Sequence, residues 1–581
     1  MTDGRGSGAG STGAGLRERV RSQSRTDAAD ERDLDVAVVG AGASGLYTAA
    51  RLLASDDGPF SDPAVEVFER ADRIGGRLHS VTLPGLDETG ELGGMRYRPD
   101  SHRIVASLVE DVFSDRLEPA PFPLGDPANH LRYLRGQRFP ADAWRQAQRA
   151  DDRFQTRYDL PEDAQGFSPG QLFRKVIHDV LRADPWFREA YGDRLRSTGP
   201  FEYHVDLDRR EWNDVKTSLT YQFPGPHAGV PVSDLGMWTV LEDQVGHEGY
   251  EFLTDGIGYY ALTANWNAAQ AMADVALDFA SETSFRTLAG GFDRLAYALA
   301  AAVLDAPGGA IRTRNALRSV RATPSADRRY ALALEHRPSA TGWTVRADHV
   351  VLAMPRRSLE LLGVENLPVE SEGFRRTVEA VIPQPALKLL LAFEEPWWRS
   401  ELGAHSGESI TDLPIRQCYY FGTNEAPDDD RSLFLASYDD ERAVSYWMDA
   451  EADGAADLDA LADAPGSDGH AAPERMVEEA MAQVRELHGA DVPDPYAARY
   501  RNWAADPFGG GYNHWKPGVP VPDAMATMRR PDPGEHVHVV GSAYSGRQGW
   551  VEGALCTAEK TLESAFGLDR PDWLADDYYL G

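Results

Sequence analysis

The stretch "DVAVVGAGASG" (residues 35–45) decides the fold. Its apolar half is typical of a buried strand, and the helical pattern "LYTAARLLA" (46–54) follows its glycines. Glycines spaced Gly-x-Gly-x-x-Gly allow a tight turn and let the backbone approach a pyrophosphate at the positive end of a helix. A second strand, "AVEVFE", ends at Glu69, where a carboxylate would hydrogen-bond the ribose hydroxyls of an adenosine. The sequence therefore predicts a dinucleotide-binding βαβ unit. The turn residues that would contact the ligand are Gly40, Gly42, Ala43, Ser44 and Gly45.

Two further glycine-rich segments point to the same ligand. In "ERADRIGGRLHS" (69–80) a glycine pair stands between two arginines, and "ELGGMRYRPD" (91–100) follows soon after. A nicotinamide-dependent enzyme needs no second phosphate-proximal turn at this place. Near the other end, "HVHVVGSAYSGRQGWVEGAL" (536–555) again runs from an apolar strand through small residues into a helical pattern. Such a turn presents backbone amides to a ligand.

These motifs resemble those of the flavin amine oxidase superfamily, close to its branch of L-amino-acid oxidases and amino-acid 2-monooxygenases. The resemblance runs from residue 34 to about residue 568 and implies FAD as the cofactor. It places the Arg-x-Gly-Gly-Arg segment along the pyrophosphate, the Gly-Gly-Met-Arg segment past the isoalloxazine ring, and the last strand and helix over the ribityl–flavin region. The FAD contacts that it implies beyond the first turn are Glu69, Arg70, Gly76, Arg77, Gly93, Gly94, Met95, Arg96, Gly541, Ser542, Gly549, Trp550 and Val551.

One of these positions departs from the family. The family commonly has Glu directly after the glycine of the last strand, and this chain has Ser542. A serine can still hydrogen-bond a ribityl hydroxyl, but it has a shorter reach and no charge. We therefore expect a contact that is weaker or shared with water.

The resemblance also predicts the architecture, an α/β FAD-dependent amine oxidase fold of two interleaved domains. We expect a Rossmann-like FAD domain from residues 34–100, 285–362 and 535–570, and a mixed-sheet substrate domain from 365–534. Residues 101–284 are expected to form a helical lid over the site. Residues 1–33, which are rich in Gly, Ser and charge, are expected to be a disordered leader.

An amino acid bound next to a flavin needs a group that clamps its carboxylate. Arginine suits this role because its planar fork meets two oxygens at once. Arg96, in "GGMRY", matches the family's carboxylate-binding arginine, and Tyr438, in "LFLASYDDERA", matches the tyrosine that supports the same carboxylate. The alternatives are a phosphate contact or a surface position for Arg96, and a packed strand position for Tyr438.

Lys388 interrupts an apolar run in "PALKLLLAFEEPWW". Strand alternation places it on one face with Ala386 and Leu390, where a lysine would lose water and its pKa would fall. The matching family lysine holds a water at flavin N5, and the alternative is an edge-strand lysine that reaches solvent. The resemblance also assigns the substrate amine to the carbonyl of Gly549 and a pocket wall to Trp550; a core position is the alternative for the tryptophan.

The helical segment carries the identity of the substrate. "GYYALTANWNAA" (258–269) looks like the subgroup that holds phenylalanine 2-monooxygenases, lysine oxidases and lysine monooxygenases. Asp255 could receive a cationic substrate side chain, or it could cap a turn, since Asp-Gly is a common turn pair. The choice between an aromatic and a basic amino acid stays open. The candidate pocket residues are Trp238, Asp255, Tyr259, Trp266 and Asn267.

Composition excludes several other classes of protein. A net charge of −33 over 581 residues argues against a nucleic-acid partner, because phosphate backbones need clustered Lys and Arg. The two cysteines and the histidines show no metal-ligand spacing, so we expect no metal. We expect no signal peptide, no membrane span, a cytoplasmic location, and a homodimer or higher oligomer by resemblance.

The resemblance implies an enzyme that moves a hydride from the α-carbon of an L-amino acid to flavin N5. O2 would then act as the electron acceptor, and the products would be a 2-oxo acid, ammonia and hydrogen peroxide. Oxidative decarboxylation to an amide, as in a 2-monooxygenase, is the close alternative. Oxidation of an amine without a carboxylate fits Arg96 poorly, and a non-catalytic dinucleotide-binding protein fits a buried Lys388 poorly.

Overall fold

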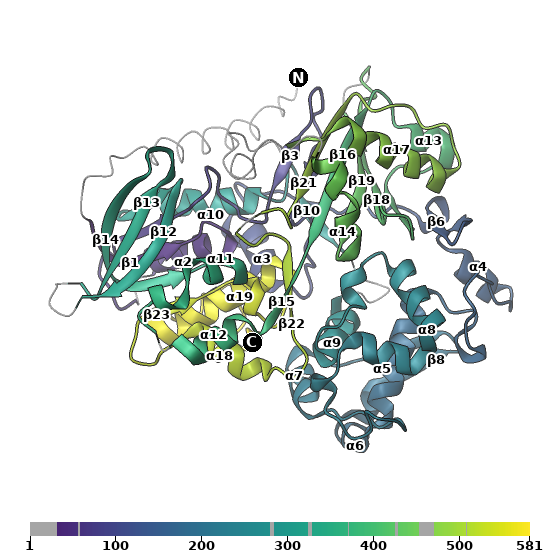
Figure 1. Cartoon of the computed structure of the whole chain (residues 1–581), viewed down its shortest axis with the longest axis horizontal. Coiled ribbons are helices and arrows are strands. Elements are labelled where there is room, and N and C mark those ends of the chain that lie inside the picture. The colour runs from purple at the N-terminus through teal and green to yellow at the C-terminus, as the bar shows by residue number, and fades with distance from the viewer. Residues whose placement is uncertain are drawn as a thin grey trace, which may run out of the picture.

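The computed structural model describes residues 32–55, 58–278, 284–323, 328–369, 371–424, 428–452, 470–506 and 508–581. Most of the predicted leader lies outside these residues, but Arg32 and Asp33 belong to the first strand, β1 (Arg32–Val39). Figure 1 shows three parts: a sheet with helices around it on the left, a second sheet at the upper right, and a group of helices at the lower right.

The first sheet has seven strands and is mainly parallel around β1. β1 lies between β2 and β14 and is parallel to both, and the antiparallel strands β13 and β12 extend the sheet beyond β14. β23 from near the C-terminus pairs in parallel with the end of β14. Because the apolar run 36–39 is buried on both faces, it suits a central parallel strand. The other strands are β2 (Val65–Phe68), β11 (Gly309–Arg312), β12 (Asn315–Ala322), β13 (Tyr330–His336), β14 (Thr341–Leu352) and β23 (Val537–Val539).

Helices cover both faces of this sheet. The alternating side chains of β1 show which helices pack on each face. Val36 and Val38 pack with α2 (Ala43–Ala54), α10 (Arg294–Asp305) and α19 (Val551–Thr561). Ala37 and Val39 pack on the opposite side with α11 (Arg356–Leu362), α12 (Ser371–Val378) and α18 (Val521–Arg529). This arrangement is a doubly wound α/β architecture, and it contains the βαβ unit predicted from the glycine motifs.

The second sheet has eight strands in the order β20-β21-β16-β19-β18-β17-β6-β7. All eight residues of β16 are buried. Leu387 and Leu389 pack against α17 (Glu474–His488), whereas Leu390 packs on the opposite face, with Met95 and Leu92. The strands are β6 (Leu131–Leu134), β7 (Gln137–Pro140), β16 (Ala386–Phe393), β17 (Gly407–Thr411), β18 (Gln417–Thr423), β19 (Ser432–Asp440), β20 (His470–Ala471) and β21 (Ala497–Asn502). Thus β6 and β7, from the stretch expected to be helical, complete this sheet.

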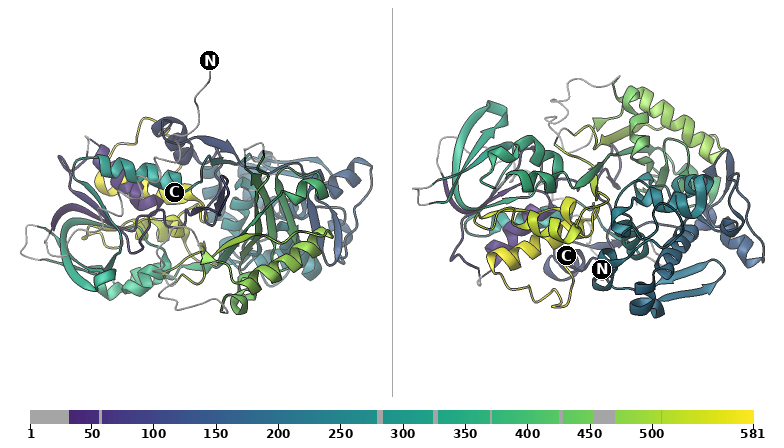
Figure 2. Two further views of the ribbon diagram at one scale, coloured as in Figure 1. Left: turned by 90° about the horizontal axis from the view of Figure 1, so that it is seen from above. Right: turned by 60° about the horizontal axis from the view of Figure 1, so that its bottom comes forward.

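The third part is a helical unit with an apolar core to which Leu134 of β6 and Phe139 of β7 also contribute. Its apolar core is formed by α5 (Pro169–Ala183), α7 (Arg209–Ser218), α8 (Met237–Ile257) and α9 (Ala268–Asp278). A capping box begins α5, in which Ser168 and Gln171 exchange side-chain and backbone hydrogen bonds. α8 ends at Gly258, whose φ of 90° turns the chain back. The right-hand view of Figure 2 shows these blue and teal helices beside the two sheets.

Short two-stranded ribbons and helices connect the three parts. The ribbon β15–β22 pairs Val381–Gln384 with Tyr512–Trp515, near the junction of the two sheets. No helix among the described residues is long and apolar enough to span a membrane. The remaining elements are β3 (Ser80–Thr82), β4 (Thr89–Glu91), β5 (Pro119–Pro121), β8 (Leu195–Gly199), β9 (Glu202–Val205), β10 (Arg286–Leu288), α3 (Arg103–Ser107), α4 (Ala143–Arg149), α6 (Pro185–Tyr191), α13 (Trp397–Leu402), α14 (Arg442–Tyr446) and α15 (Met448–Ala452).

Candidate active site

A cavity of about 490 Å³ joins the first sheet to the second. It begins at the carboxyl ends of β1, β2 and β14, where ligands bind in open α/β sheets. It ends against Lys388 and Tyr438 of the second sheet. Of the predicted site residues, the following line it: Gly40, Gly42, Ala43, Ser44, Glu69, Arg70, Gly76, Arg77, Gly93, Gly94, Lys388, Tyr438, Gly541, Ser542, Gly549, Trp550 and Val551.

The glycines of the first turn have two different roles: two of them allow close packing, and one leaves open space. A Cβ at Gly40 would lie 2.4 Å from the carbonyl oxygen of Ala353, and one at Gly45 would lie 2.0 Å from the carbonyl oxygen of Gly40. A Cβ at Gly42 would meet nothing within 4 Å. Gly40 and Gly45 therefore let strand and helix approach, while Gly42 leaves the N-terminus of α2 open to a ligand. Gly45 lies behind the cavity wall.

Glu69 closes the adenosine end. Its two carboxylate oxygens accept hydrogen bonds from the backbone N–H of Ala41 and of Ala71, both at 2.8 Å. Burial raises the pKa of Glu69, and those two donors oppose the rise. Beside it, the Arg70 guanidinium stacks on the ring of Phe508. The carboxylate is thus fixed at the end of β2, as the motif predicts for a ribose contact.

The second glycine turn lies directly against the first. The backbone N–H of Gly75 donates to the carbonyl oxygen of Ala41 at 2.8 Å. Gly76 has a φ of 58°, and a Cβ there would lie 3.3 Å from the Cα of Gly42. The two turns therefore form one backbone cradle, and this contact is why the sequence has glycines in both.

Ser542, the position that departs from the family pattern, has a hydrogen-bond partner in Arg77. Arg77 donates from Nη1 to the carbonyl oxygen of Gly511 at 3.0 Å and from Nη2 to the Oγ of Ser542 at 3.1 Å. Burial lowers the pKa of Arg77. Ser542 therefore lines the cavity and also accepts a hydrogen bond from Arg77 of the cradle.

Lys388 is buried at the inner end of the cavity, with 3% of its surface exposed. Its Nζ donates to the carbonyl oxygen of Gly93 at 2.7 Å and lies 3.3 Å from the Sδ of Met95. It also lies 4.4 Å from the centre of the Tyr438 ring. Burial lowers the pKa of Lys388 to about 7, although the carboxylate of Glu91 opposes the shift. The lysine therefore lines the cavity from the interior and does not reach solvent.

Arg96 follows the cavity-lining glycines and turns into an aromatic enclosure. Its guanidinium carbon lies 4.3 Å from the ring centre of Phe285 and 5.1 Å from that of Phe122. Nη2 lies 3.4 Å from the hydroxyl oxygen of Tyr259, whose ring meets that of Tyr438 edge-on at 5.3 Å. Arg96 forms no ion pair with any carboxylate among the described residues, and neither it nor Met95 lines the cavity directly.

Gly549 and Trp550 form the opposite wall, just before α19. The Trp550 ring lies 4.8 Å from His102 in an edge contact and stacks at 6.2 Å on Phe285. Phe285 therefore lies between Trp550 and Arg96 and joins the two predicted substrate contacts.

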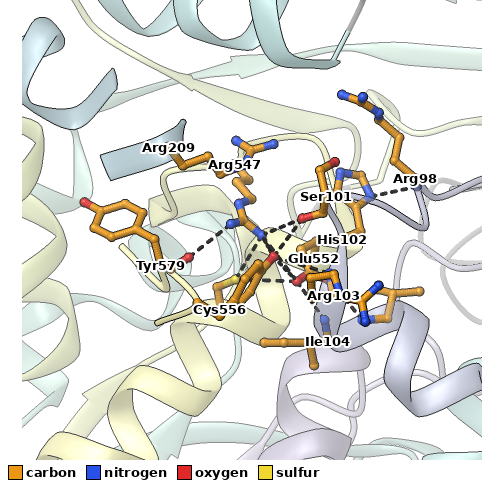
Figure 3. A network of polar contacts seen from close by, with 12 residues as sticks. Arg98, Ser101, His102, Arg103, Ile104, Arg209, Arg547, Glu552, Cys556 and Tyr579 are labelled. Atoms are coloured by element: carbon orange, nitrogen blue, oxygen red, sulfur yellow. Dashed lines mark hydrogen bonds and ion pairs between the residues drawn. The ribbon is translucent and has the colours of Figure 1, made fainter. Parts of the chain in front are cut away.

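The start of α19 is anchored by the network drawn in Figure 3. Glu552 accepts the backbone N–H groups of Ile104 and Val105 at 2.9 Å each, and Arg547 donates to the carbonyl oxygen of Tyr579 at 3.0 Å. This network fixes the segment that carries Gly549 and Trp550.

Comparison with known proteins agrees with this geometry. The model of the family "Flavin containing amine oxidoreductase" matches residues 43–561. The chain belongs to this family. It is 26% identical to aplysianin-A of Aplysia kurodai, covering 95% of this chain and 94% of that protein. It is 24% identical to L-amino-acid oxidase 4 of Hebeloma cylindrosporum, covering 91% of this chain and 81% of that protein.

The fold of this flavin amine oxidoreductase is that of putrescine oxidase. A variant of that enzyme superposes with a TM-score of 0.61 at 17% identity, covering 92% of this chain and 99% of the other. The cofactor is FAD, and the residues present fit it. The paired glycine turns leave an open backbone cradle at a helix N-terminus, where a pyrophosphate binds, and the cavity continues from there to Lys388.

The structure does not bring every candidate of this amine oxidoreductase to the cavity. Asp255 lies inside α8, where it accepts a hydrogen bond from the Tyr158 hydroxyl at 2.8 Å and lies 3.8 Å from Arg416. Asp255 therefore does not line the cavity and does not cap a turn. Its carboxylate faces Arg416 of the protein instead of a substrate cation. Trp238 is 47% exposed and stacks on Tyr250.

Two other candidates from the same segment are buried within the protein. Trp266 stacks on His514 at 3.8 Å, and the backbone N–H of Asn267 donates to the carbonyl oxygen of Trp515 at 2.9 Å. Of the five candidate pocket residues, Tyr259 joins the predicted substrate contacts.

One segment of the site was missed in the sequence. Residues 503–512, "WAADPFGGGY", line the cavity at all their described positions except 504 and 505, and the indole N–H of Trp503 donates to the carbonyl oxygen of Leu92 at 2.7 Å. A Cβ at Gly511 would lie 2.0 Å from the carbonyl oxygen of Gln384. Three successive glycines after an aromatic residue were the signal that could have identified it.

Proposed function

We propose that this flavin amine oxidoreductase oxidises a free L-amino acid and passes the electrons to O2. The observation that supports this is the guanidinium of Arg96, which forms no ion pair with the described residues and is enclosed by Phe285, Phe122 and Tyr259 next to the cavity. An enclosed arginine without an anion is costly unless a ligand supplies one. A carboxylate is an anion that a guanidinium fork can meet with two parallel hydrogen bonds.

The surrounding residues suit the rest of an amino acid. Tyr438 lies at the cavity and can support the same carboxylate, and the Gly549 carbonyl can accept the α-amine. Trp550 would close the site on the opposite side. Holding the substrate at three points converts a random encounter into a near-attack geometry.

The chemistry divides between cofactor and protein. When bound, FAD would supply the acceptor for the hydride from the α-carbon and the route by which the electrons reach O2. The protein orients the substrate and excludes bulk water. The substrate reacts in the form whose α-amine is neutral. Lys388, with a pKa lowered to about 7 by burial, can hold a water at the inner end of the cavity and exchange a proton with it near neutral pH. The products would be hydrogen peroxide and an imino acid, which hydrolyses to a 2-oxo acid and ammonia.

Two other outcomes are tested alongside. Retention of the imino acid would lead to oxidative decarboxylation and an amide. A diamine substrate is disfavoured, because it would leave Arg96 without a counter-ion. The putrescine oxidase likeness, at 17% identity, carries the fold alone.

A substrate panel decides between these outcomes. The purified protein would be offered the twenty L-amino acids, putrescine and other common amines, with peroxide measured and products identified by mass spectrometry. A 2-oxo acid from at least one amino acid supports the proposal. An amide one carbon shorter identifies a 2-monooxygenase. Turnover of amines alone would overturn the proposal.

A further inference from the structure

The helical unit reaches the substrate site through the short segment that follows α8. Gly258 turns the chain, and its carbonyl oxygen accepts a hydrogen bond from Nε2 of Gln417 at 3.0 Å. A Cβ at Gly258 would lie 2.9 Å from Cγ of Gln417. The end of α8 is therefore pressed against β18 of the second sheet, and the next residue, Tyr259, is aimed at Arg96.

Asp440 anchors the two residues that follow. Oδ1 accepts the backbone N–H of Tyr260 at 2.9 Å, and Oδ2 accepts that of Ala261 at 3.2 Å. Oδ2 also accepts the hydroxyl of Tyr512 at 2.8 Å. Only 1% of the residue is exposed. One buried carboxylate thus joins the helical unit, β19 and β22.

Asp440 also stands in register with the substrate clamp. It lies two residues after Tyr438 on β19, so both side chains point to the same face of the sheet. Tyr259 contacts both clamp residues, since its hydroxyl lies 3.4 Å from Nη2 of Arg96 and its ring contacts that of Tyr438. Among the described residues, the Arg96 guanidinium donates one hydrogen bond, which goes to the Tyr259 hydroxyl.

We propose that Tyr259 is a third member of the carboxylate clamp and that Asp440 is the positioning residue that places it there. The inference rests on the proposed amino-acid oxidation and assigns the helical unit a direct part in it. The Tyr259 hydroxyl accepts a hydrogen bond from the guanidinium fork, and from this position it can donate to a carboxylate that the fork binds. A clamp of this kind works only if each member is already in place, and the three donors to Asp440 provide that rigidity.

The first test removes one hydroxyl and keeps the ring. Tyr259→Phe, with FAD bound, should raise the KM for the best amino acid roughly tenfold, with kcat within about twofold, because one hydrogen bond to a charged group is lost. The Kd for benzoate, read from the change in flavin absorbance, should rise by a similar factor. The matched control is Tyr158→Phe, which removes a hydroxyl from the same helical unit away from the cavity and should change neither value.

The second test asks whether Asp440 acts through Tyr259. Asp440→Asn should also raise the KM and the benzoate Kd. In the Tyr259→Phe background, the same substitution should add less than about twofold, because coupled residues are not additive. If Asp440 acted independently of Tyr259, its full effect on KM would persist in the Tyr259→Phe background. If Asp440 were purely structural, its substitution would lower the melting temperature and leave KM unchanged. Either result, or unchanged benzoate binding in Tyr259→Phe, would overturn the inference.

Different results would contradict the proposed function and the role of Tyr259. If the wild-type protein oxidises no amino acid and Arg96→Ala binds benzoate as the wild type does, the proposed function is wrong. If Arg96→Ala loses benzoate binding while Tyr259→Phe keeps it, the proposed function stands and the role of Tyr259 is wrong.

Discussion

The Nη2 of Arg77 donates to the Oγ of Ser542 at 3.1 Å, across 465 positions of the chain. This hydrogen bond joins the second glycine turn to the end of the last strand. Where the related enzymes commonly have a glutamate, this protein therefore has a serine whose oxygen is already used by the cradle.

Ser542→Ala should weaken FAD binding. The substitution removes the acceptor of Arg77 and a hydroxyl that faces the cavity, so the Kd for FAD should rise by up to roughly tenfold. The measurement is a fluorescence titration of the apoprotein with FAD. Ser564→Ala is the control, since that hydroxyl is exposed and bonds to the carbonyl oxygen of Lys560. Equal affinities in the two variants would show that Ser542 makes no contribution.

Arg96→Ala should leave FAD bound and raise the KM for amino acids by about 100-fold or more, as expected when one partner of a buried charged pair is lost. Arg96→Lys should recover only part of the loss, because an ammonium cannot meet two oxygens as a planar fork does. Steady-state kinetics with the flavin spectrum as the folding control measures both. Unchanged kinetics in Arg96→Ala would remove this arginine from the site.

Lys388→Met should slow one flavin half-reaction at least roughly tenfold while substrate binding survives, as expected for loss of a proton-transfer group. Because burial lowers the pKa of Lys388 to about 7, the amine is neutral above that pH and protonated below it. The rate of the affected step in the wild type should therefore rise with pH through about 7, and the variant should lose this dependence.

Stopped-flow measurements of reduction and reoxidation separate the two half-reactions. Lys216→Met is a matched control, because this lysine bonds to Oε1 of Gln270 at 3.0 Å, away from the cavity. Normal rates in both half-reactions of Lys388→Met would contradict the assignment.

Three histidines on the first sheet should make the protein sensitive to acid. The His349 ring stacks on His536 at 4.2 Å and on His538 at 6.1 Å. Burial lowers the pKa of His349 to about 3 and that of His538 to about 4. As the pH falls below about 6.5, the unfolded chain takes up protons that the folded protein does not, so stability is lost by up to about 1.4 kcal/mol per pH unit and histidine.

Urea denaturation between pH 7.5 and pH 4.5 tests this expectation. His349→Phe should reduce the slope of the free energy of unfolding against pH over that range. His204→Phe, at an exposed position, should leave the slope as it is. Parallel curves for the wild type and His349→Phe would contradict a role for the stacked histidines.

The parts of the site that could be predicted from sequence are those built by local chain geometry. The glycine turns follow from spacing within a few residues, and Lys388 stands out because it interrupts a buried strand. Asp255 shows the limit. Its neighbours in sequence suggest a turn, but Arg416, 161 positions away, holds its backbone carbonyl and faces its carboxylate.

Tyr259 and Asp440 are a second case in which sequence gives no local signal. They meet because one helix end docks on one strand, and no local pattern in either segment specifies that meeting. Likewise β6 and β7 lie within a mainly helical stretch and join the second sheet through a pairing with β17. Interactions between distant segments decide these cases.

The cavity takes its walls from residues 39–44 and from residues 541–554, which pack on the same sheet. During synthesis, the first glycine turn therefore leaves the ribosome long before the strand and helix that complete its pocket. We therefore expect the cofactor to be loaded late, because a nascent chain that stalls before β23 lacks the part of the cavity wall formed by residues 541–554. Once bound, the cofactor would tie early and late segments together, so its loss and the onset of unfolding should coincide.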